Sequence, residues 1–95
     1  MLGEVIEAYL TQTVETREEL ILGIDERDTH ALERAAHKLR GMCANVGASA
    51  LSSVCAELET LGRLAQLDRA AGIVERFDAE FARVRDALNL LATTS

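Results

Sequence analysis

Apolar residues recur at helical spacing along almost the whole chain, and this periodicity constrains the fold more than any other feature. Four stretches, at about 4–24, 29–46, 48–61 and 69–91, place apolar residues three and four positions apart with charged residues between them. The sequence has no proline, and no stretch shows the alternating β-branched and aromatic pattern of a sheet. We therefore predict an all-α protein in which short links join antiparallel neighbours, an up-down four-helix bundle.

The same periodicity predicts which side chains face the core. The inward-facing positions are Val5, Ile6, Tyr9, Leu10, Thr13, Leu20, Ile21, Ile24, Leu32, Ala35, Ala36, Leu39, Met42, Cys43, Val46, Leu51, Val54, Cys55, Leu58, Leu61, Ile73, Val74, Phe77, Phe81, Val84, Leu88 and Leu91. Polar residues mark the helix ends. Asp28 or Thr29 suits an N-cap of the second stretch, and Asp68 suits an N-cap of the fourth. Asn45 to Gly47 suits a left-handed C-terminal cap.

Length and composition indicate one compact domain over residues 1–95. The chain is 48% hydrophobic, which excludes a disordered segment. A net charge of −6 argues against a general nucleic-acid binder. No stretch approaches the roughly 18 apolar residues that span a bilayer, and the acidic start lacks the features of a signal peptide. We expect a cytoplasmic protein with no membrane insertion by this segment.

The two cysteines fit that setting. Cys43 and Cys55 lie within predicted helices and form no C-x-x-C motif. We interpret them as small apolar core residues, with a redox pair or a shared metal as the alternative.

The second stretch carries a histidine on its polar side. His37 points about 180° from the middle of the apolar stripe, and Gly41 and Ala44 follow on the same exposed line. A glycine inside a helix costs about 0.5–1 kcal/mol relative to alanine. The economical explanation is that another protein's surface comes close to this imidazole.

The chemistry available at His37 is nucleophilic. An exposed imidazole without a buried carboxylate partner is expected to be largely neutral at pH 7. Arg34 and Arg40 lie about 60° away on the helix and Lys38 about 100° away, so their long side chains can bring positive charge to a phosphoryl group. The sequence has no nucleotide-binding glycine motif and no carboxylate cluster for Mg²⁺. A partner would therefore supply the metal, the activated phosphate and most of the catalysis.

A metal site at His37 is disfavoured by distance. His30, Glu33 and His37 share one face, but the two histidines are about 10.5 Å apart along the axis. Zinc–nitrogen bonds are about 2.0–2.1 Å, so one ion does not comfortably reach both rings.

The segment from Asp28 to Glu59 resembles the histidine-containing phosphotransfer (HPt) domains of bacterial phosphorelays. The family pattern is roughly A-H-x-L-K-G, then a small residue and G-A, then L-x-x-x-C-x-x-L-E. This chain has Ala36-His37-Lys38-Leu39-Arg40-Gly41, Asn45-Val46-Gly47-Ala48, Leu51, Val54-Cys55 and Leu58-Glu59. The resemblance is strong over this hairpin and looser over the flanking helices.

The resemblance implies a four-helix bundle in which His37 accepts a phosphoryl group from an aspartyl phosphate of a receiver domain and passes it to another receiver. Lys38 and Arg40 would assist electrostatically, and Gly41 would keep the surface low beside the imidazole. Arg40 stands where the family commonly has lysine, so a planar fork replaces a point charge. Such domains occur alone or at the C-terminus of hybrid sensor kinases.

We therefore expect a monomeric phosphoryl carrier without kinase activity of its own. It would hold no cofactor, and Mg²⁺ would belong to the receiver. Two alternatives remain open. One is a module that docks receivers without carrying phosphate. The other is a helical dimerisation domain, which the lack of a continuous heptad seam disfavours.

Overall fold

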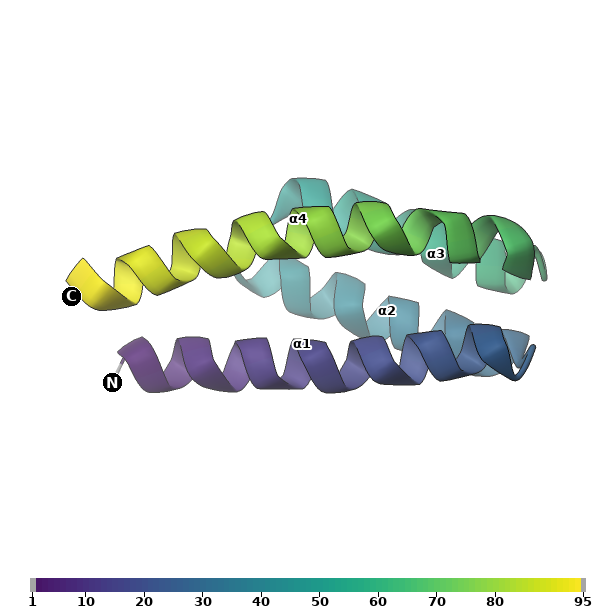
Figure 1. The fold of residues 1–95 in the computed structure, drawn as a ribbon, viewed down its shortest axis with the longest axis horizontal. Coiled ribbons are helices and arrows are strands. Elements are labelled where there is room, and N and C mark those ends of the chain that lie inside the picture. Colours follow the sequence, from purple (N-terminus) through teal and green to yellow (C-terminus); the bar gives the residue numbers. More distant parts are fainter. Residues whose placement is uncertain (1, 95) are drawn as a thin grey trace.

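The computed structural model describes residues 2–94, apart from the side chain of Thr94, and this part of the chain is built from helices alone. The helices are α1 (Leu2–Asp25), α2 (Thr29–Asn45), α3 (Ser49–Arg63) and α4 (Leu67–Thr94). They form an up-down bundle, as Figure 1 shows, so the prediction of an all-α four-helix architecture is confirmed. None of the described helices is long and apolar enough to cross a membrane.

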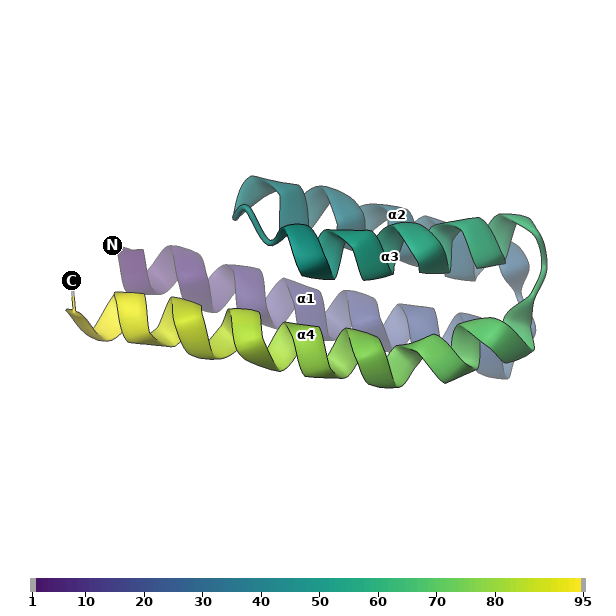
Figure 2. The ribbon, with the colours of Figure 1, turned by 90° about the horizontal axis from the view of Figure 1, so that it is seen from above.

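The helices differ in length, and this difference shapes the molecule. α1 packs against α2 and α4, and α3 packs against α2 and α4. The bundle is elongated, with extents of 43 × 19 × 18 Å. Figure 2 shows that α1 and α4 continue past the turn of the α2–α3 hairpin and that both ends of the chain lie there. One end of the molecule is therefore built from two helices rather than four.

The core follows the predicted apolar faces in all four helices. Its completely buried side chains include Leu20, Leu32, Leu39, Leu51, Leu58 and Phe77. Phe77 stacks on Phe81 with ring centroids 6.0 Å apart, which adds a directional contact to the burial of both rings.

Three of the predicted core positions are wrong. Val5 is 67% exposed and Leu91 is 51% exposed; they belong to the first turn of α1 and the last turn of α4, the ends at which these two helices extend past the hairpin. Val46 is 39% exposed because it forms the end of α2 at the turn to α3. Helical spacing identifies a face, but the length of the neighbouring helices decides whether that face is covered.

The ends of α2 agree with the predicted caps. The Asp28 carboxylate accepts a hydrogen bond from the backbone N–H of Ala31 at 3.0 Å, so Asp28 rather than Thr29 is the N-cap. Gly47 follows the helix with a φ of +70°, the left-handed conformation predicted there.

The start of α4 differs from the prediction. The helix begins at Leu67, so Asp68 lies inside its first turn and is not the N-cap. The link from α3 is shorter than expected because α3 continues to Arg63. Ala65 turns the chain with a φ of +58°, and the Gln66 N–H then bonds to the Leu61 carbonyl at 2.9 Å.

Two glycines set how closely α2 approaches its neighbours. A Cβ at Gly23 of α1 would lie 2.9 Å from the backbone nitrogen of Leu32, and a Cβ at Gly62 of α3 would lie 3.0 Å from that of Glu33. The first turns of α2 are therefore held against backbone on both sides. This close packing fixes the helix that carries His37.

Candidate functional site

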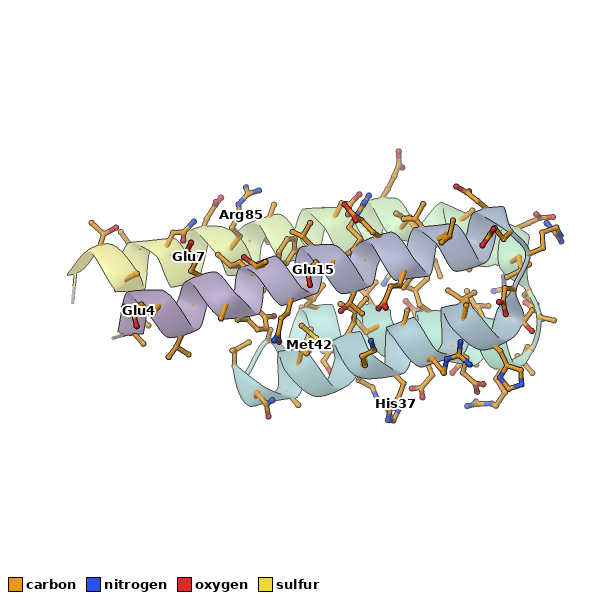
Figure 3. The ribbon with its side chains drawn as sticks, turned by 90° about the horizontal axis from the view of Figure 1, so that it is seen from below. Glu4, Glu7, Glu15, His37, Met42 and Arg85 are labelled. Atoms are coloured by element: carbon orange, nitrogen blue, oxygen red, sulfur yellow. The ribbon has the colours of Figure 1, made fainter. Side chains whose placement is uncertain are left out.

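His37 lies near the middle of α2 and projects away from the bundle. Its side chain is 65% exposed, and Figure 3 shows it on the outer side of α2, directed away from α1. The buried face of the same helix includes Ala36 and Leu39, which are the neighbours of His37 and Lys38 in the chain. The prediction that the imidazole is open to solvent is confirmed.

The imidazole has a carboxylate partner that the sequence analysis missed. His37 Nδ1 lies 2.8 Å from Glu59 Oε2, and the Glu59 side chain is only 14% exposed. The expectation of an unpartnered imidazole was therefore wrong, because α3 runs back along α2 and places Glu59 beside His37. Glu59 ends the family-like segment of α3, but spacing within one helix does not show which residue meets His37 across the hairpin.

This contact assigns the two ring nitrogens different tasks. An ionised carboxylate can only accept a hydrogen bond, so Nδ1 must carry the proton that it donates to Glu59. In the neutral ring the lone pair then resides on Nε2. The ring is held in orientation, and its basic nitrogen is the one that Glu59 does not occupy.

Arg40 joins the same cluster. Its Nη1 lies 3.1 Å from Glu59 Oε1, and its Nη2 lies 3.4 Å from His37 Nδ1. We regard the second contact as charge proximity rather than a hydrogen bond, since Nδ1 already donates to Glu59 at the shorter distance. The predicted cation at this position is thus close to the ring and anchored to the carboxylate that orients it.

Lys38 is directed elsewhere. Its Nζ lies 3.1 Å from Glu19 Oε2 on α1, and both side chains are more than half exposed. Consecutive residues of α2 therefore turn to opposite neighbours, His37 to α3 and Lys38 to α1.

An open hollow of ≈ 350 Å³ lies around the imidazole. It is lined by Glu33, Arg34, His37, Lys38 and Glu59, so the structure brings Arg34 and Lys38 to the histidine as the helical spacing predicted. The described residues contain no group of three or more His, Cys, Asp or Glu side chains placed to hold a metal ion. The site is therefore an exposed imidazole with a largely buried carboxylate beside it and cations at its rim.

The line that continues from His37 along α2 is open. Gly41 and Ala44 are both exposed, and a Cβ built at Gly41 meets no atom within 4 Å among the described residues. Nothing in the described fold requires a glycine at position 41, in contrast to positions 23 and 62.

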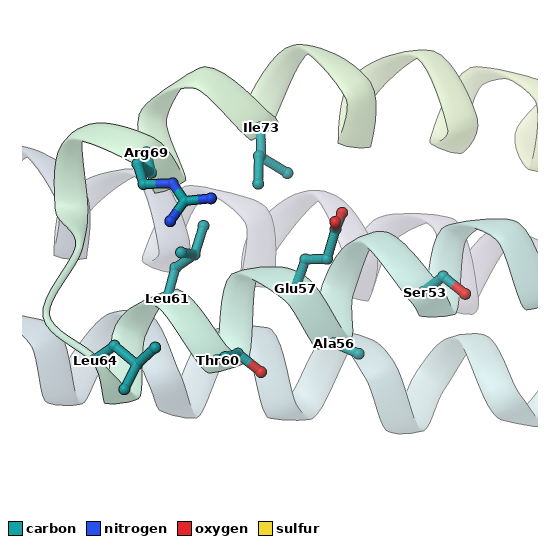
Figure 4. A pocket seen from close by; sticks show the side chains of 8 residues that line it. All are labelled: Ser53, Ala56, Glu57, Thr60, Leu61, Leu64, Arg69 and Ile73. Carbon is teal, nitrogen blue, oxygen red and sulfur yellow. The ribbon is translucent and has the colours of Figure 1, made fainter.

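A second surface feature lies between α3 and α4. This groove of ≈ 450 Å³ is shown in Figure 4 and is lined by Ser53, Ala56, Glu57, Thr60, Leu61, Leu64, Arg69 and Ile73. Its charged side chains are already paired, Glu57 with Arg76 at 2.9 Å and Arg69 with Gln66 at 2.8 Å. The groove contains no histidine or cysteine, so the chemistry concentrates at His37.

Cys43 and Cys55 are buried as predicted. The Tyr9 hydroxyl lies 4.0 Å from the Cys43 sulfur. A hydrogen bond with Cys43, together with burial, raises the pKa of the Cys55 thiol, and burial raises the pKa of the Tyr9 hydroxyl. The Cys55 thiol and the Tyr9 hydroxyl therefore stay protonated.

Fold and site together define a helical-bundle domain with a solvent-exposed histidine held by a carboxylate. A family model described as "Hpt domain" matches residues 4–87, and the chain therefore belongs to the Hpt domain family. The resemblance and the fold inferred from the sequence are confirmed. No curated protein sequence matches the chain.

A solved structure supports the same assignment. The chain resembles the crystal structure of histidine-containing phosphotransfer protein B (HptB) from Pseudomonas aeruginosa PAO1, with a TM-score of 0.90 and 29% sequence identity. The similarity covers 95% of this chain and 78% of that chain. The chain thus has a histidine phosphotransfer role in a phosphorelay, in which Hpt domains work with receiver domains.

Proposed function

We propose that the protein is a phosphorelay intermediate that accepts a phosphoryl group on His37 from the aspartyl phosphate of one receiver domain and passes it to an aspartate of another. The observation that carries this proposal is the exposed imidazole whose Nδ1 is held by Glu59 at 2.8 Å. That contact leaves Nε2 as the nucleophile at the surface.

The receiver docks along the line from His37 through Gly41 to Ala44. The open space at Gly41 lets a partner backbone approach the helix beside the imidazole. The completed active site is shared, because the receiver contributes the phosphorylated aspartate and the Mg²⁺ that holds the phosphoryl oxygens.

In the forward step the Nε2 lone pair attacks phosphorus in line with the acyl phosphate bond. The new N–P bond forms as the P–O bond to aspartate breaks, and aspartate leaves as a carboxylate. The ring keeps its Nδ1 proton and gains positive charge, which the Glu59 carboxylate stabilises. Attack by an aspartate of a second receiver reverses these bond changes.

The cations at the rim offset the charge of the phosphoryl group. Arg40 is fixed beside the ring by Glu59, and Arg34 and Lys38 line the same hollow. Transition states of phosphoryl transfer spread charge over three equatorial oxygens, so neighbouring cations lower the barrier. As part of this proposal the protein acts in the cytoplasm as a monomeric carrier, without kinase activity of its own.

The proposal is tested by a pair of histidine variants. A purified receiver domain is phosphorylated with acetyl phosphate and Mg²⁺ and is then mixed with wild type, His37→Gln or His30→Gln. His30 is the other histidine and lies exposed in the first turn of α2, so its variant is a matched control. We expect acid-labile, base-stable label on wild type and His30→Gln and none on His37→Gln, with the helical circular dichroism of all three unchanged.

Two results would refute the proposal. Label that persists on His37→Gln would place the acceptor elsewhere. Binding of several phosphorylated receivers without any label on wild type would indicate a docking module instead of a carrier.

A further inference from the structure

Lys38 borders the imidazole of His37, but its ammonium group is paired with Glu19 on α1. Lys38 lines two adjoining hollows. One contains His37, Arg34 and Glu59, and the other contains residues of α1, including Glu15 and Glu19. In the structure its ammonium group lies 3.1 Å from the Glu19 carboxylate. Lys38 is therefore placed between an anion on α1 and the imidazole of His37.

We propose that Glu19 is a positioning residue that competes with the phosphoryl group on His37 for the ammonium group of Lys38. This inference rests on His37 being the acceptor proposed above. Glu19 thereby weakens the phosphorylated state of His37 and keeps its phosphoryl group easy to pass on.

The exposure of the pair makes this competition possible. Lys38 and Glu19 have side chains that are 59% and 56% exposed, and ion pairs of this kind are weak and screened by salt. A phosphoryl group carries up to about two negative charges on three oxygens, whereas Glu19 carries one charge on two. Lys38 therefore exchanges between the two anions, and Glu19 reduces the fraction of time that it spends at the phosphoryl group.

Arg40 shows the contrasting arrangement. Its guanidinium is anchored to Glu59, the same carboxylate that contacts the ring, and it lies on the Nδ1 side of His37, so its position does not depend on the loading of Nε2. Glu19 is bonded to Lys38 and does not hold the ring. A phosphoryl group on His37 therefore draws Lys38 away from Glu19 without disturbing the orientation of the imidazole. Of these two cations, only Lys38 is subject to this competition.

The test uses a phosphoryl donor that requires no receiver. In phosphoramidate, attack by His37 breaks the P–N bond and releases ammonia while the new N–P bond forms. The ratio of phosphorylated to free His37 is measured by ³¹P nuclear magnetic resonance at fixed phosphoramidate and ammonium concentrations. We expect Glu19→Gln to raise this ratio by about two- to fivefold at low salt, the range that corresponds to a surface ion pair, and the increase to shrink as salt is added.

Two controls isolate the role of Lys38. Glu15→Gln removes the same charge from α1, one turn away, and Glu15 forms no ion pair in the described part of the chain. It should leave the ratio at the wild-type value. In a Lys38→Ala background, Glu19→Gln should have no further effect, because the coupling between the two positions is then absent.

The inference is overturned if Glu19→Gln leaves the ratio unchanged, if Glu15→Gln raises it equally, or if the effect of Glu19→Gln survives in Lys38→Ala. These outcomes are independent of receivers. Loss of transfer from a phosphorylated receiver, with normal labelling by phosphoramidate, would count against the proposed relay and leave the role of Glu19 in place.

Discussion

The two faces of α2 differ in what they require from the rest of the protein. On the inner face, Leu32, Ala36, Leu39 and Cys43 are completely buried against the other helices. On the outer face, His37, Gly41 and Ala44 are exposed, and a side chain added at Gly41 would meet nothing within 4 Å in the described structure. The inner face explains why the helix is where it is. The residues of the outer face contribute nothing to that packing. We therefore explain the exposed histidine and the glycine beside it by the approach of a partner protein.

The largest expected effect is on the inner face. Leu39→Ala removes a completely buried side chain two positions from His37, and we expect it to lower the free energy of unfolding by about 2–5 kcal/mol. Urea denaturation followed by circular dichroism measures this loss. Phosphoryl label per folded molecule should stay near the wild-type level. A variant that folds fully but takes no label would show that phosphoryl transfer at the outer face depends on the packing of the inner face.

The next effect concerns the glycine that contacts α2 from α1. Gly23→Ala would place a Cβ 2.9 Å from the backbone nitrogen of Leu32, and the backbone cannot move aside cheaply. We expect a loss of about 1–3 kcal/mol in unfolding free energy, despite the better helix propensity of alanine. A variant as stable as wild type would mean that α1 and α2 can separate slightly without cost.

The smallest effect on stability has the opposite sign and belongs to the outer face. Gly41→Ala should raise the free energy of unfolding by about 0.5–1 kcal/mol, because the position is helical and open. The same variant should slow labelling by a phosphorylated receiver, since the added methyl group stands where the partner approaches. Faster or unchanged labelling would remove the argument that Gly41 is kept for docking.

The sequence was sufficient to predict the features that depend on one helix at a time. The exposure of His37 and the burial of Leu39 both follow from the position of each residue around α2. An N-cap at Asp28 or Thr29, which the structure assigns to Asp28, and the left-handed Gly47 follow from local backbone chemistry. These features require no knowledge of how the helices pack.

The features that the sequence did not predict depend on the register between helices. Glu59 meets His37 across the α2–α3 hairpin, and Glu19 meets Lys38 across α1 and α2. Both contacts join residues about twenty positions apart, and a shift of one helical turn would replace either partner. Val5 and Leu91 were wrongly placed in the core for a related reason, because a sequence pattern does not reveal where a neighbouring helix stops.

In the relay that we propose, Glu59 holds Nδ1 of His37 and leaves Nε2 to take the phosphoryl group. The most direct measurement is the site of the N–P bond after transfer from a phosphorylated receiver, determined by ¹⁵N and ³¹P nuclear magnetic resonance on protein with ¹⁵N-labelled histidine. The structure predicts coupling of phosphorus to Nε2 of His37. Coupling to Nδ1, or to a nitrogen of His30, would contradict it.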